Sequence, residues 1–294
     1  VWPMTAIGWC LSLLQRGSAS MRRIDEVMEE KTEIIPKDNV TLQFIPKGEI
    51  EFRDVNFRYD CDKEWILKGI HLRIPTGQRT AIVGPIGSGK STLVNMLSRI
   101  IPVNDQSIFI DGVDINTIDI KALRKYIGFV PQETFLFSER IEDNILFGVE
   151  TGKDNNNVQQ FARIAGIEEE IQELPQKYES YLGERGINLS GGQKQRITIA
   201  RALAIQPSII ILDDCLSAVD ARVEGTIMKN ILKNFPGRTL LVVTHRLPAI
   251  RGFDMIVVMK EGVIVERGTH EQLITVNGLY TSLYTKEVLE ERLG

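Results

Sequence analysis

Short apolar runs separated by polar turns recur from residue 49 onward, and their spacing predicts a sheet-based fold. Over residues 49–59, polar and apolar residues alternate, which is typical of a half-buried strand. Apolar runs predict further strands at 70–74, 79–83, 107–112, 126–130, 209–212, 240–243, 255–259 and 262–266. The last two of these runs predict a hairpin near the end of the chain.

Helical spacing replaces this pattern in the middle of the chain. Residues 158–165 and 167–174 carry apolar side chains at helical intervals, and they interrupt the alternation of strands and helices. We therefore predict an inserted helical subdomain over about residues 135–200 of an α/β fold.

The N-terminal part has a different composition from the rest. Residues 1–14 carry no charge and arginines follow them directly. Crossing a bilayer takes about 20 apolar residues, so we interpret 1–14 as the cut end of a membrane helix in a fragment of a longer protein, with the arginines on the cytoplasmic side. A core helix or an interfacial helix is the alternative. Residues up to 33 continue as an amphipathic connector, and residues 34–48 predict a linker.

Composition narrows the classes of function. Lysine and arginine total 35 against 39 acidic residues, so the net charge of −4 argues against nucleic acid as the main partner. The three cysteines, Cys10, Cys61 and Cys215, lack C-x-x-C spacing, which predicts neither a disulfide framework nor a zinc site and fits a reducing, cytosolic setting. We interpret Cys215 as a small buried hydrophobic residue and His71 as a solvated strand position.

Residues 84–91 match the phosphate-loop pattern G-x-x-x-x-G-K-[ST] at every fixed position, between a predicted strand and a helix-like stretch. Glycines let successive backbone N–H groups face inward, and the following helix N-terminus adds its positive dipole end. Lys90 would reach the β- and γ-phosphates, and Ser91 would offer its hydroxyl to Mg²⁺. A glycine-rich turn that only resembles the pattern is the alternative.

Two buried strands are each followed by chemistry-bearing residues. Asp213 and Asp214 come after 209–212, and His245 comes shortly after 240–243. In an open α/β sheet the carboxyl ends of the strands form the ligand edge, so Asp213 is placed to hold Mg²⁺ or its waters. Tyr59 ends the first strand, where it would stack on a nucleobase or serve only as a rim aromatic.

The stretch Leu-Ser-Gly-Gly-Gln at 189–193 is a feature that phosphate loops in general lack, and with it the chain resembles the nucleotide-binding domain of an ABC transporter. The resemblance covers about residues 49–290. Its matching parts occur in the family's order: Tyr59, the 84–91 loop, Gln132, the 189–193 signature, Asp213, the D-loop at 217–220, and His245. Residues 183–186 are similar to an element found in exporters, and residues 1–30 look like the last membrane helix of an exporter half-transporter.

The resemblance implies a P-loop NTPase core with a mostly parallel sheet, an N-terminal antiparallel β portion and the inserted helical subdomain. It implies these roles: ATP binding by Tyr59, Gly84, Pro85, Ile86, Gly87, Ser88, Gly89, Lys90, Ser91 and Thr92; catalysis by Gln132, Asp214 and His245; Mg²⁺ binding by Ser91, Gln132 and Asp213; the D-loop residues Ser217 and Asp220; and the signature residues Leu189, Ser190, Gly191, Gly192 and Gln193.

The resemblance also implies partners. Two such domains would join head to tail, each ATP lying between the phosphate loop of one and the signature of the other. Ser190 and the N–H groups of the next two glycines, ahead of a helix opening at Gln193, would then meet the γ-phosphate from the far side. The domain would lie at the cytoplasmic face of the cell membrane, linked to a transmembrane domain of the same full-length chain.

One position departs from the family pattern, because Asp214 stands where glutamate is common. A carboxylate that is one methylene shorter loses hydrogen-bond reach to the same water, and a misplacement of about 1 Å can cost on the order of 100-fold in rate. We therefore predict that this chain's own site hydrolyses ATP slowly, in a heterodimer with a glutamate-bearing subunit. A homodimer in which Asp214 works adequately is the alternative. Ile86, where a small polar residue is frequent, is a milder departure.

Two other functions are compatible with these motifs. A soluble ABC ATPase would act on ribosomes or DNA without transport, but such proteins usually carry paired cassettes or long coiled coils. A nearly inactive ATP-binding subunit would regulate a partner instead of driving export.

Overall fold

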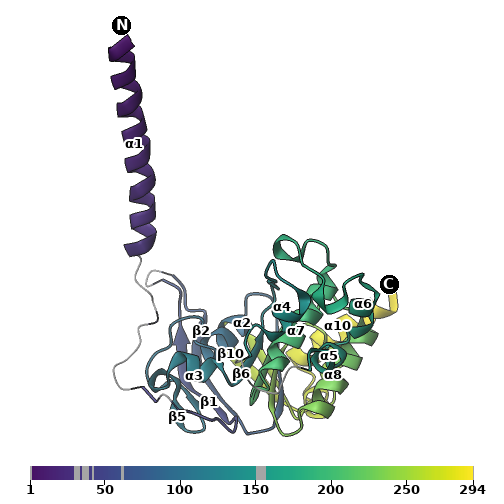
Figure 1. Ribbon diagram of the computed structural model, residues 1–294. Coiled ribbons are helices and arrows are strands. Elements are labelled where there is room, and N and C mark those ends of the chain that lie inside the picture. Colours follow the sequence, from purple (N-terminus) through teal and green to yellow (C-terminus); the bar gives the residue numbers. More distant parts are fainter. Residues whose placement is uncertain are drawn as a thin grey trace. The chain divides into compact units, whose positions relative to one another are not determined.

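The computed structural model describes residues 2–29, 34, 40–41, 43–60, 63–149 and 157–293 (Figure 1). The chain divides into two compact units, Val1–Ile35 and Pro36–Gly294. In the first unit, α1 (Trp2–Glu29) is a single helix of 28 residues, none of them buried. Over the described ranges, no helix combines the length and the apolar character that crossing a membrane requires. Parts of the predicted connector and linker, at 30–33, 35–39 and 42, lie outside the described residues.

The second unit is built around a six-stranded sheet in the order β10-β9-β3-β8-β7-β6. Its strands are β3 (Arg79–Val83), β6 (Ile127–Val130), β7 (Ile209–Asp213), β8 (Thr239–Val243), β9 (Met255–Lys260) and β10 (Val263–Gly268). All neighbours are parallel except the hairpin of β9 and β10. The predicted mostly parallel sheet and terminal hairpin are therefore confirmed.

The central strands are mostly apolar because both faces of the sheet are covered. Every residue of β7 and β8 is buried. Successive residues of β7 enter two different cores: Ile209 and Ile211 pack in one, and Ile210 and Leu212 in the other. Burying one such side chain stabilises the fold by about 1.5–3 kcal/mol, so the strand carrying Asp213 is firmly held.

A smaller antiparallel sheet, in the order β2-β1-β4-β5, supplies the N-terminal β portion that the sequence predicts. It consists of β1 (Ile50–Phe57), β2 (Leu67–Ile74), β4 (Ile108–Ile110) and β5 (Val113–Asp114). The prediction of one strand over 49–59 was too long, because β1 stops where its last pair, Phe57 with Leu67, is formed. The same pairing starts β2 three residues before the predicted 70–74. The two-residue strand β5 was not predicted.

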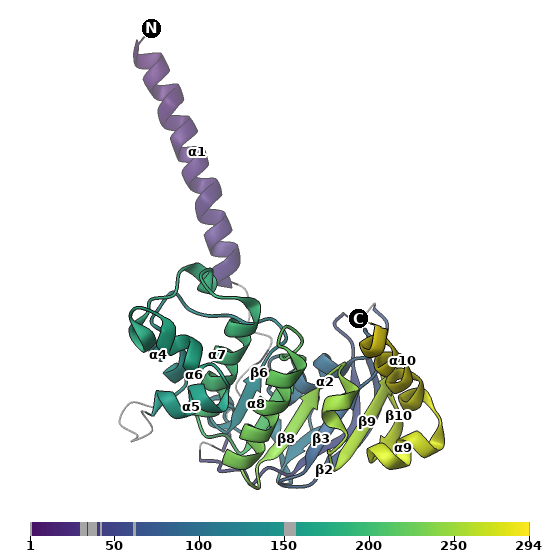
Figure 2. The same ribbon diagram turned by 90° about the vertical axis from the view of Figure 1, so that its right-hand side faces the viewer.

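Helices fill the stretch between β6 and β7, as predicted. They are α4 (Ile141–Leu146), α5 (Val158–Ile164), α6 (Glu168–Glu173) and α7 (Gly191–Ala204), with 3-10 turns at Lys177–Glu179 and Glu184–Gly186. Figure 2 shows these helices grouped beside the β6 end of the sheet, with α9 and α10 at the β10 end. The predicted helix start at Gln193 was two residues late. Ser190 and Gln193 form a capping box, which lets the helix begin at Gly191.

The other helices cover the faces of the sheets. They are α2 (Lys90–Leu97), α3 (Ile120–Arg124), α8 (Ala221–Asn234), α9 (His270–Val276) and α10 (Leu279–Leu293), with 3-10 turns at Ile115–Thr117 and Leu247–Ile250. Only α2 was predicted. The signal for α8 was present in the sequence, because Val223, Ile227 and Ile231 recur at four-residue spacing and all three belong to the core or pack against it.

Candidate nucleotide-binding site

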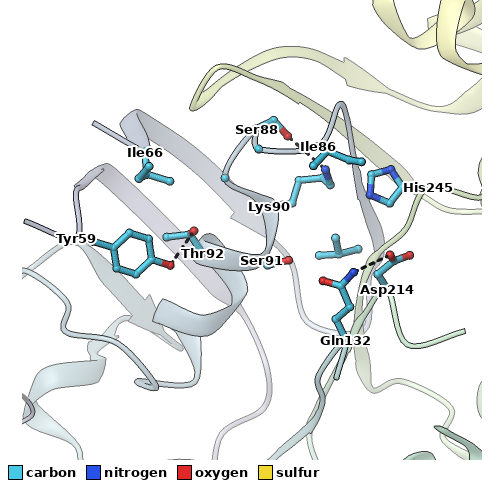
Figure 3. A pocket seen from close by; sticks show the side chains of 13 residues that line it. Tyr59, Ile66, Ile86, Ser88, Lys90, Ser91, Thr92, Gln132, Asp214 and His245 are labelled. Carbon is cyan, nitrogen blue, oxygen red and sulfur yellow. Dashed lines mark hydrogen bonds between the residues drawn. The ribbon is translucent and has the colours of Figure 1, made fainter. Parts of the chain in front are cut away.

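A cavity of about 410 Å³ opens at the carboxyl ends of β3, β6, β7 and β8. It is lined by the loop residues Ile86, Gly87, Ser88, Gly89, Lys90, Ser91 and Thr92, and by Tyr59, Ile66, Gln132, Asp214, Val243 and His245. In Figure 3, Tyr59 and Ile66 lie at one end, Gln132, Asp214 and His245 at the other, with Lys90 and Ser91 between them. The structure thus brings most of the predicted ATP-binding and catalytic residues to one place.

The loop between β3 and α2 is fixed by close packing. At Gly84, whose φ is 145°, a Cβ atom would lie 2.0 Å from the carbonyl oxygen of Met259, so only glycine fits. The Lys90 amine is buried and donates to the carbonyl oxygens of Gly84 at 2.9 Å and Pro85 at 2.8 Å. Burial lowers the pKa of Lys90, while the carboxylates of Asp213 and Asp214 oppose that change. The loop therefore presents a desolvated cation at the floor of the cavity.

Two oxygen atoms meet beside this cation. The Ser91 hydroxyl donates to Oδ1 of Asp213 at 2.9 Å. Burial raises the pKa of Asp213, and the Ser91 hydrogen bond opposes that rise. Within the described residues, no group of three or more His, Cys, Asp or Glu side chains gathers to hold a metal. Mg²⁺ usually takes one or two protein oxygens plus phosphates and water, so the Ser91 and Asp213 pair fits that ion.

Asp214 follows β7 directly and has a left-handed backbone, with φ 45°. Aspartate is one of the few residues besides glycine that adopt this conformation readily. Its N–H donates to the carbonyl oxygen of Val243 at 2.8 Å, which ties the ends of β7 and β8 together. Gln132 donates from Nε2 to Oδ2 of Asp214 at 3.4 Å (Figure 3). Asp214 therefore connects the carboxyl ends of β6, β7 and β8.

The charges of Asp214 and His245 influence each other. Burial raises the pKa of Asp214, while the charges of His245 and Lys90 and a hydrogen bond from the His245 backbone oppose the rise. Burial and the Lys90 charge lower the pKa of His245, and Asp214 opposes that change. At neutral pH, His245 is therefore a neutral imidazole with one N–H donor and one acceptor nitrogen.

The opposite end of the cavity is less polar. The Tyr59 ring is 56% exposed, and its hydroxyl lies 3.4 Å from the hydroxyl of Thr92. Phe57 supports the ring edge to face, with centroids 5.0 Å apart. Ile66 and Val243 also line the cavity, and neither was predicted as a site residue. Val243 is the last residue of a predicted strand and carried a usable signal, whereas Ile66 precedes β2 in a stretch without one.

The signature residues lie elsewhere, since none of residues 189–193 is among those that line the cavity of this chain. Ser190 caps α7 and accepts from the Gln193 N–H at 3.2 Å. The D-loop lies between the two regions. The Ser217 hydroxyl donates to the Asp214 carbonyl oxygen at 3.1 Å, and the Asp220 side chain caps α8 by accepting from the Arg222 N–H at 2.8 Å.

Two residues outside the site agree with their predicted structural roles. Cys215 is buried, and burial raises the pKa of its thiol. His71 is exposed on β2, where its Nδ1 accepts from the Asp54 N–H at 3.4 Å. Cys10 is exposed, and Cys61 lies outside the described residues.

Together, the glycine loop that opens α2 and the polar residues at neighbouring strand ends define a P-loop nucleotide-binding protein. A family profile described as ABC transporter matches residues 67–217, about half of the sequence. The chain belongs to the ABC transporter family, and the resemblance seen in its sequence is confirmed.

Known relatives have the same domain within longer proteins. The "Probable multidrug resistance ABC transporter ATP-binding/permease protein YheI" of Bacillus subtilis is 43% identical over 98% of this chain and 49% of its own length. The "ATP-dependent lipid A-core flippase" of Desulfotalea psychrophila is 40% identical over 97% of this chain and 49% of its own length. The chain therefore spans about half the length of these relatives.

A solved structure supports the same assignment. The protein described as "Structure of a bacterial Atm1-family ABC exporter with ATP bound" superposes with a TM-score of 0.86 and 35% sequence identity. The match covers 93% of this chain and 48% of that one. The fold is thus that of the ATP-binding part of an ABC exporter.

Proposed function

We propose that this chain binds and hydrolyses ATP and thereby powers the export of a substrate across a membrane. One observation carries the proposal: Lys90 and Ser91 of the glycine loop face Gln132, Asp214 and His245 across a single cavity. Cations and hydrogen-bond donors that surround the transferred phosphoryl group are the main source of catalysis in this reaction class.

The loop side of the cavity would hold the nucleotide. Lys90 binds the β- and γ-phosphates once its amine turns from the Gly84 and Pro85 carbonyls, and Tyr59 stacks on the base. Ser91 and Asp213, with Gln132 nearby, would hold Mg²⁺. That ion neutralises phosphate charge when it is bound.

The strand-end side would carry the hydrolysis. Asp214 orients the attacking water, and the neutral imidazole of His245 donates to a γ-phosphate oxygen. The short Asp214 side chain is held near the backbone by Gln132 and by the His245 N–H. We therefore propose that this site turns over slowly. The same contacts favour the second candidate function, a nearly inactive ATP-binding subunit that regulates its partner.

A second ABC domain would complete the site. The N-terminus of α7 is exposed at Ser190 and Gly191 and lies outside this chain's cavity, which supports a role for the signature at a partner's ATP. ATP binding would close such a dimer and hydrolysis would reopen it. Because Asp214 replaces the usual glutamate, a heterodimer with a glutamate-bearing subunit is the preferred arrangement.

The membrane part of the proposal rests on the relatives and on α1. Two proteins about twice as long, one described as an ATP-binding/permease protein and the other as a flippase, contain this domain, so a transmembrane domain of the same full-length chain would precede it. Exposed apolar side chains on α1, among them Trp2, Ile7 and Trp9, suit the end of a membrane helix within residues 1–33. The ATPase domain would then lie at the cytoplasmic face of the cell membrane.

Two measurements test the proposed function. Magnesium-dependent ATP turnover is measured for this chain alone and in an equimolar mixture with a glutamate-bearing ABC domain. Slow turnover alone and faster turnover in the mixture support the export motor, whereas ATP binding without turnover in either sample supports the regulatory subunit. Extraction of the full-length protein from cells tests the membrane assignment: recovery without detergent overturns it in favour of a soluble ABC ATPase.

A further inference from the structure

The side chain of Arg246, the residue after His245, donates hydrogen bonds to three acceptor groups. The guanidinium of Arg246 donates to the carbonyl oxygens of Val219 at 2.7 Å and Ser217 at 3.0 Å. It also donates to Oε2 of Glu224 at 2.8 Å. A planar fork of donors suits this arrangement of three acceptors, and the single ammonium of lysine would not.

The two carbonyl groups belong to the D-loop, and they flank Ala218. That residue in turn touches the start of the signature helix, because a Cβ atom on Gly192 would lie only 3.1 Å from the Ala218 carbonyl oxygen. At its other end the D-loop contacts Asp214 through the Ser217 hydroxyl, at 3.1 Å. Arg246 therefore holds a segment that contacts both the backbone carbonyl group of Asp214 and the start of the signature helix.

The backbone of Arg246 is fixed as well. Its N–H donates to the Thr244 hydroxyl at 2.9 Å, and the next N–H, of Leu247, donates to the Glu287 carboxylate at 2.8 Å. Before His245, the Thr244 N–H donates to the carbonyl oxygen of Ile82 at 3.3 Å, so the segment that carries His245 is anchored on both sides of that residue. A shift of the D-loop relative to His245 would require at least one of the Arg246 hydrogen bonds to break.

We propose that Arg246 is a positioning residue for ATP hydrolysis: it keeps the D-loop, residues 217–220, in register with His245 and Asp214. The inference rests on the proposed ATPase function of the cavity. Arg246 itself lies outside the residues that line the cavity, so it acts through the segment it holds and not by contact with nucleotide. Its loss should lower kcat and leave the affinity for ATP unchanged.

A purely structural role for Arg246 has to be separated from this one. The Glu224 side chain is only 6% exposed, and a buried carboxylate that loses its cation destabilises a fold strongly. Arg246→Met alone therefore mixes two effects. Glu224→Gln removes the buried charge and keeps the two carbonyl contacts, and the double variant removes the charge and the contacts together.

The test compares turnover, ATP affinity and unfolding temperature for the wild type, Glu224→Gln and the double variant. Arg79→Met is the matched control, because Arg79 has a similar exposure of 35% and a carboxylate partner, Asp254, at the far end of β3. We expect Glu224→Gln and Arg79→Met to keep kcat within about twofold. The double variant should unfold near the temperature of Glu224→Gln, yet lose about 10- to 100-fold in kcat at unchanged ATP affinity.

If the kcat of the double variant equals that of Glu224→Gln, the proposal is overturned, because Arg246 would then only neutralise the charge of Glu224. Hydrogen exchange provides a readout that does not depend on turnover. The amide groups of residues 217–220 should exchange faster in the double variant than in Glu224→Gln, while those of the 84–91 loop stay unchanged. Equal exchange at 217–220 also contradicts the proposal. If the wild type fails to bind ATP, the ATPase function fails, and exchange alone decides whether Arg246 holds the D-loop.

Discussion

The hydroxyl of Ser91 donates a 2.9 Å hydrogen bond to Oδ1 of Asp213, a residue 122 positions later in the chain. One group opens α2 and the other ends β7, so the contact exists only because β7 packs two strands from β3 in the sheet. Both oxygens are acceptors of the kind that Mg²⁺ prefers. This pair is the structural basis for expecting that nucleotide binding depends on the metal.

Removing the Ser91 hydroxyl tests that expectation. With Ser91→Ala, we expect Mg²⁺ to add little to the stabilisation that ATP gives, because one ligand oxygen is lost. A tenfold loss of affinity corresponds to about 1.4 kcal/mol less stabilisation at saturating ligand. Thermal unfolding with ATP and Mg²⁺, compared with ATP and a chelator, measures the effect. Thr275→Ala removes an exposed hydroxyl of α9 and should behave as wild type. Equal Mg²⁺ dependence in both variants would contradict the assignment.

We predict that Lys90 is essential for ATP binding and unnecessary for folding. Its amine is buried against carbonyl oxygens, and burial already lowers its pKa, so the charge is held at a cost to stability. We expect Lys90→Met to keep or raise the free energy of unfolding in urea. Loss of a charge-assisted contact worth about 1.5–3 kcal/mol should weaken ATP binding by roughly 10- to 100-fold. Calorimetric titration measures the affinity, and undiminished binding would show that the nucleotide lies elsewhere.

Lengthening the carboxylate at position 214 should speed hydrolysis. Asp214→Glu restores reach toward the attacking water, and we expect turnover to rise by up to about 100-fold. Glutamate is less suited than aspartate to the left-handed backbone with φ 45°, which should cost about 1 kcal/mol in unfolding free energy. Asp214→Asn, which keeps the length and removes the charge, is the control and should be slower than wild type. No gain in a folded, ATP-binding Asp214→Glu variant would refute the slow-site proposal.

The pH dependence of stability should report His245. Its pKa in the folded chain lies below the ordinary 6.5, so on acidification the unfolded chain takes up this proton first. The free energy of unfolding should therefore fall as the pH drops from 6.5 toward the lowered pKa. The pKa of Asp214 in the folded chain is raised above 3.8, so at lower pH the folded chain takes up this proton first. This group therefore raises the free energy of unfolding as the pH falls further. His245→Gln should flatten the decline below pH 6.5, and urea unfolding at several pH values measures it. An unchanged slope would mean that another group titrates there.

Much of the fold could be predicted because its signals are local. The buried strands β7 and β8 are continuous apolar runs, and the glycine loop has a fixed spacing, so neither depends on distant residues. Element ends were less accurate, since pairing sets them: β1 stops at Phe57 because its ladder with β2 stops there. The two-residue strand β5 has no periodicity to detect.

The sequence by itself determined the chemistry of this protein: which residues bear charge, which loop can cradle phosphate, and that aspartate occupies position 214. Only the tertiary structure decided how these residues meet. It placed Ser91 against Asp213, gave Ile66 a place in the cavity, and joined Arg246 to the D-loop. The physical reason is that such contacts join residues far apart in the chain, whose meeting depends on strand order and helix packing and not on local spacing.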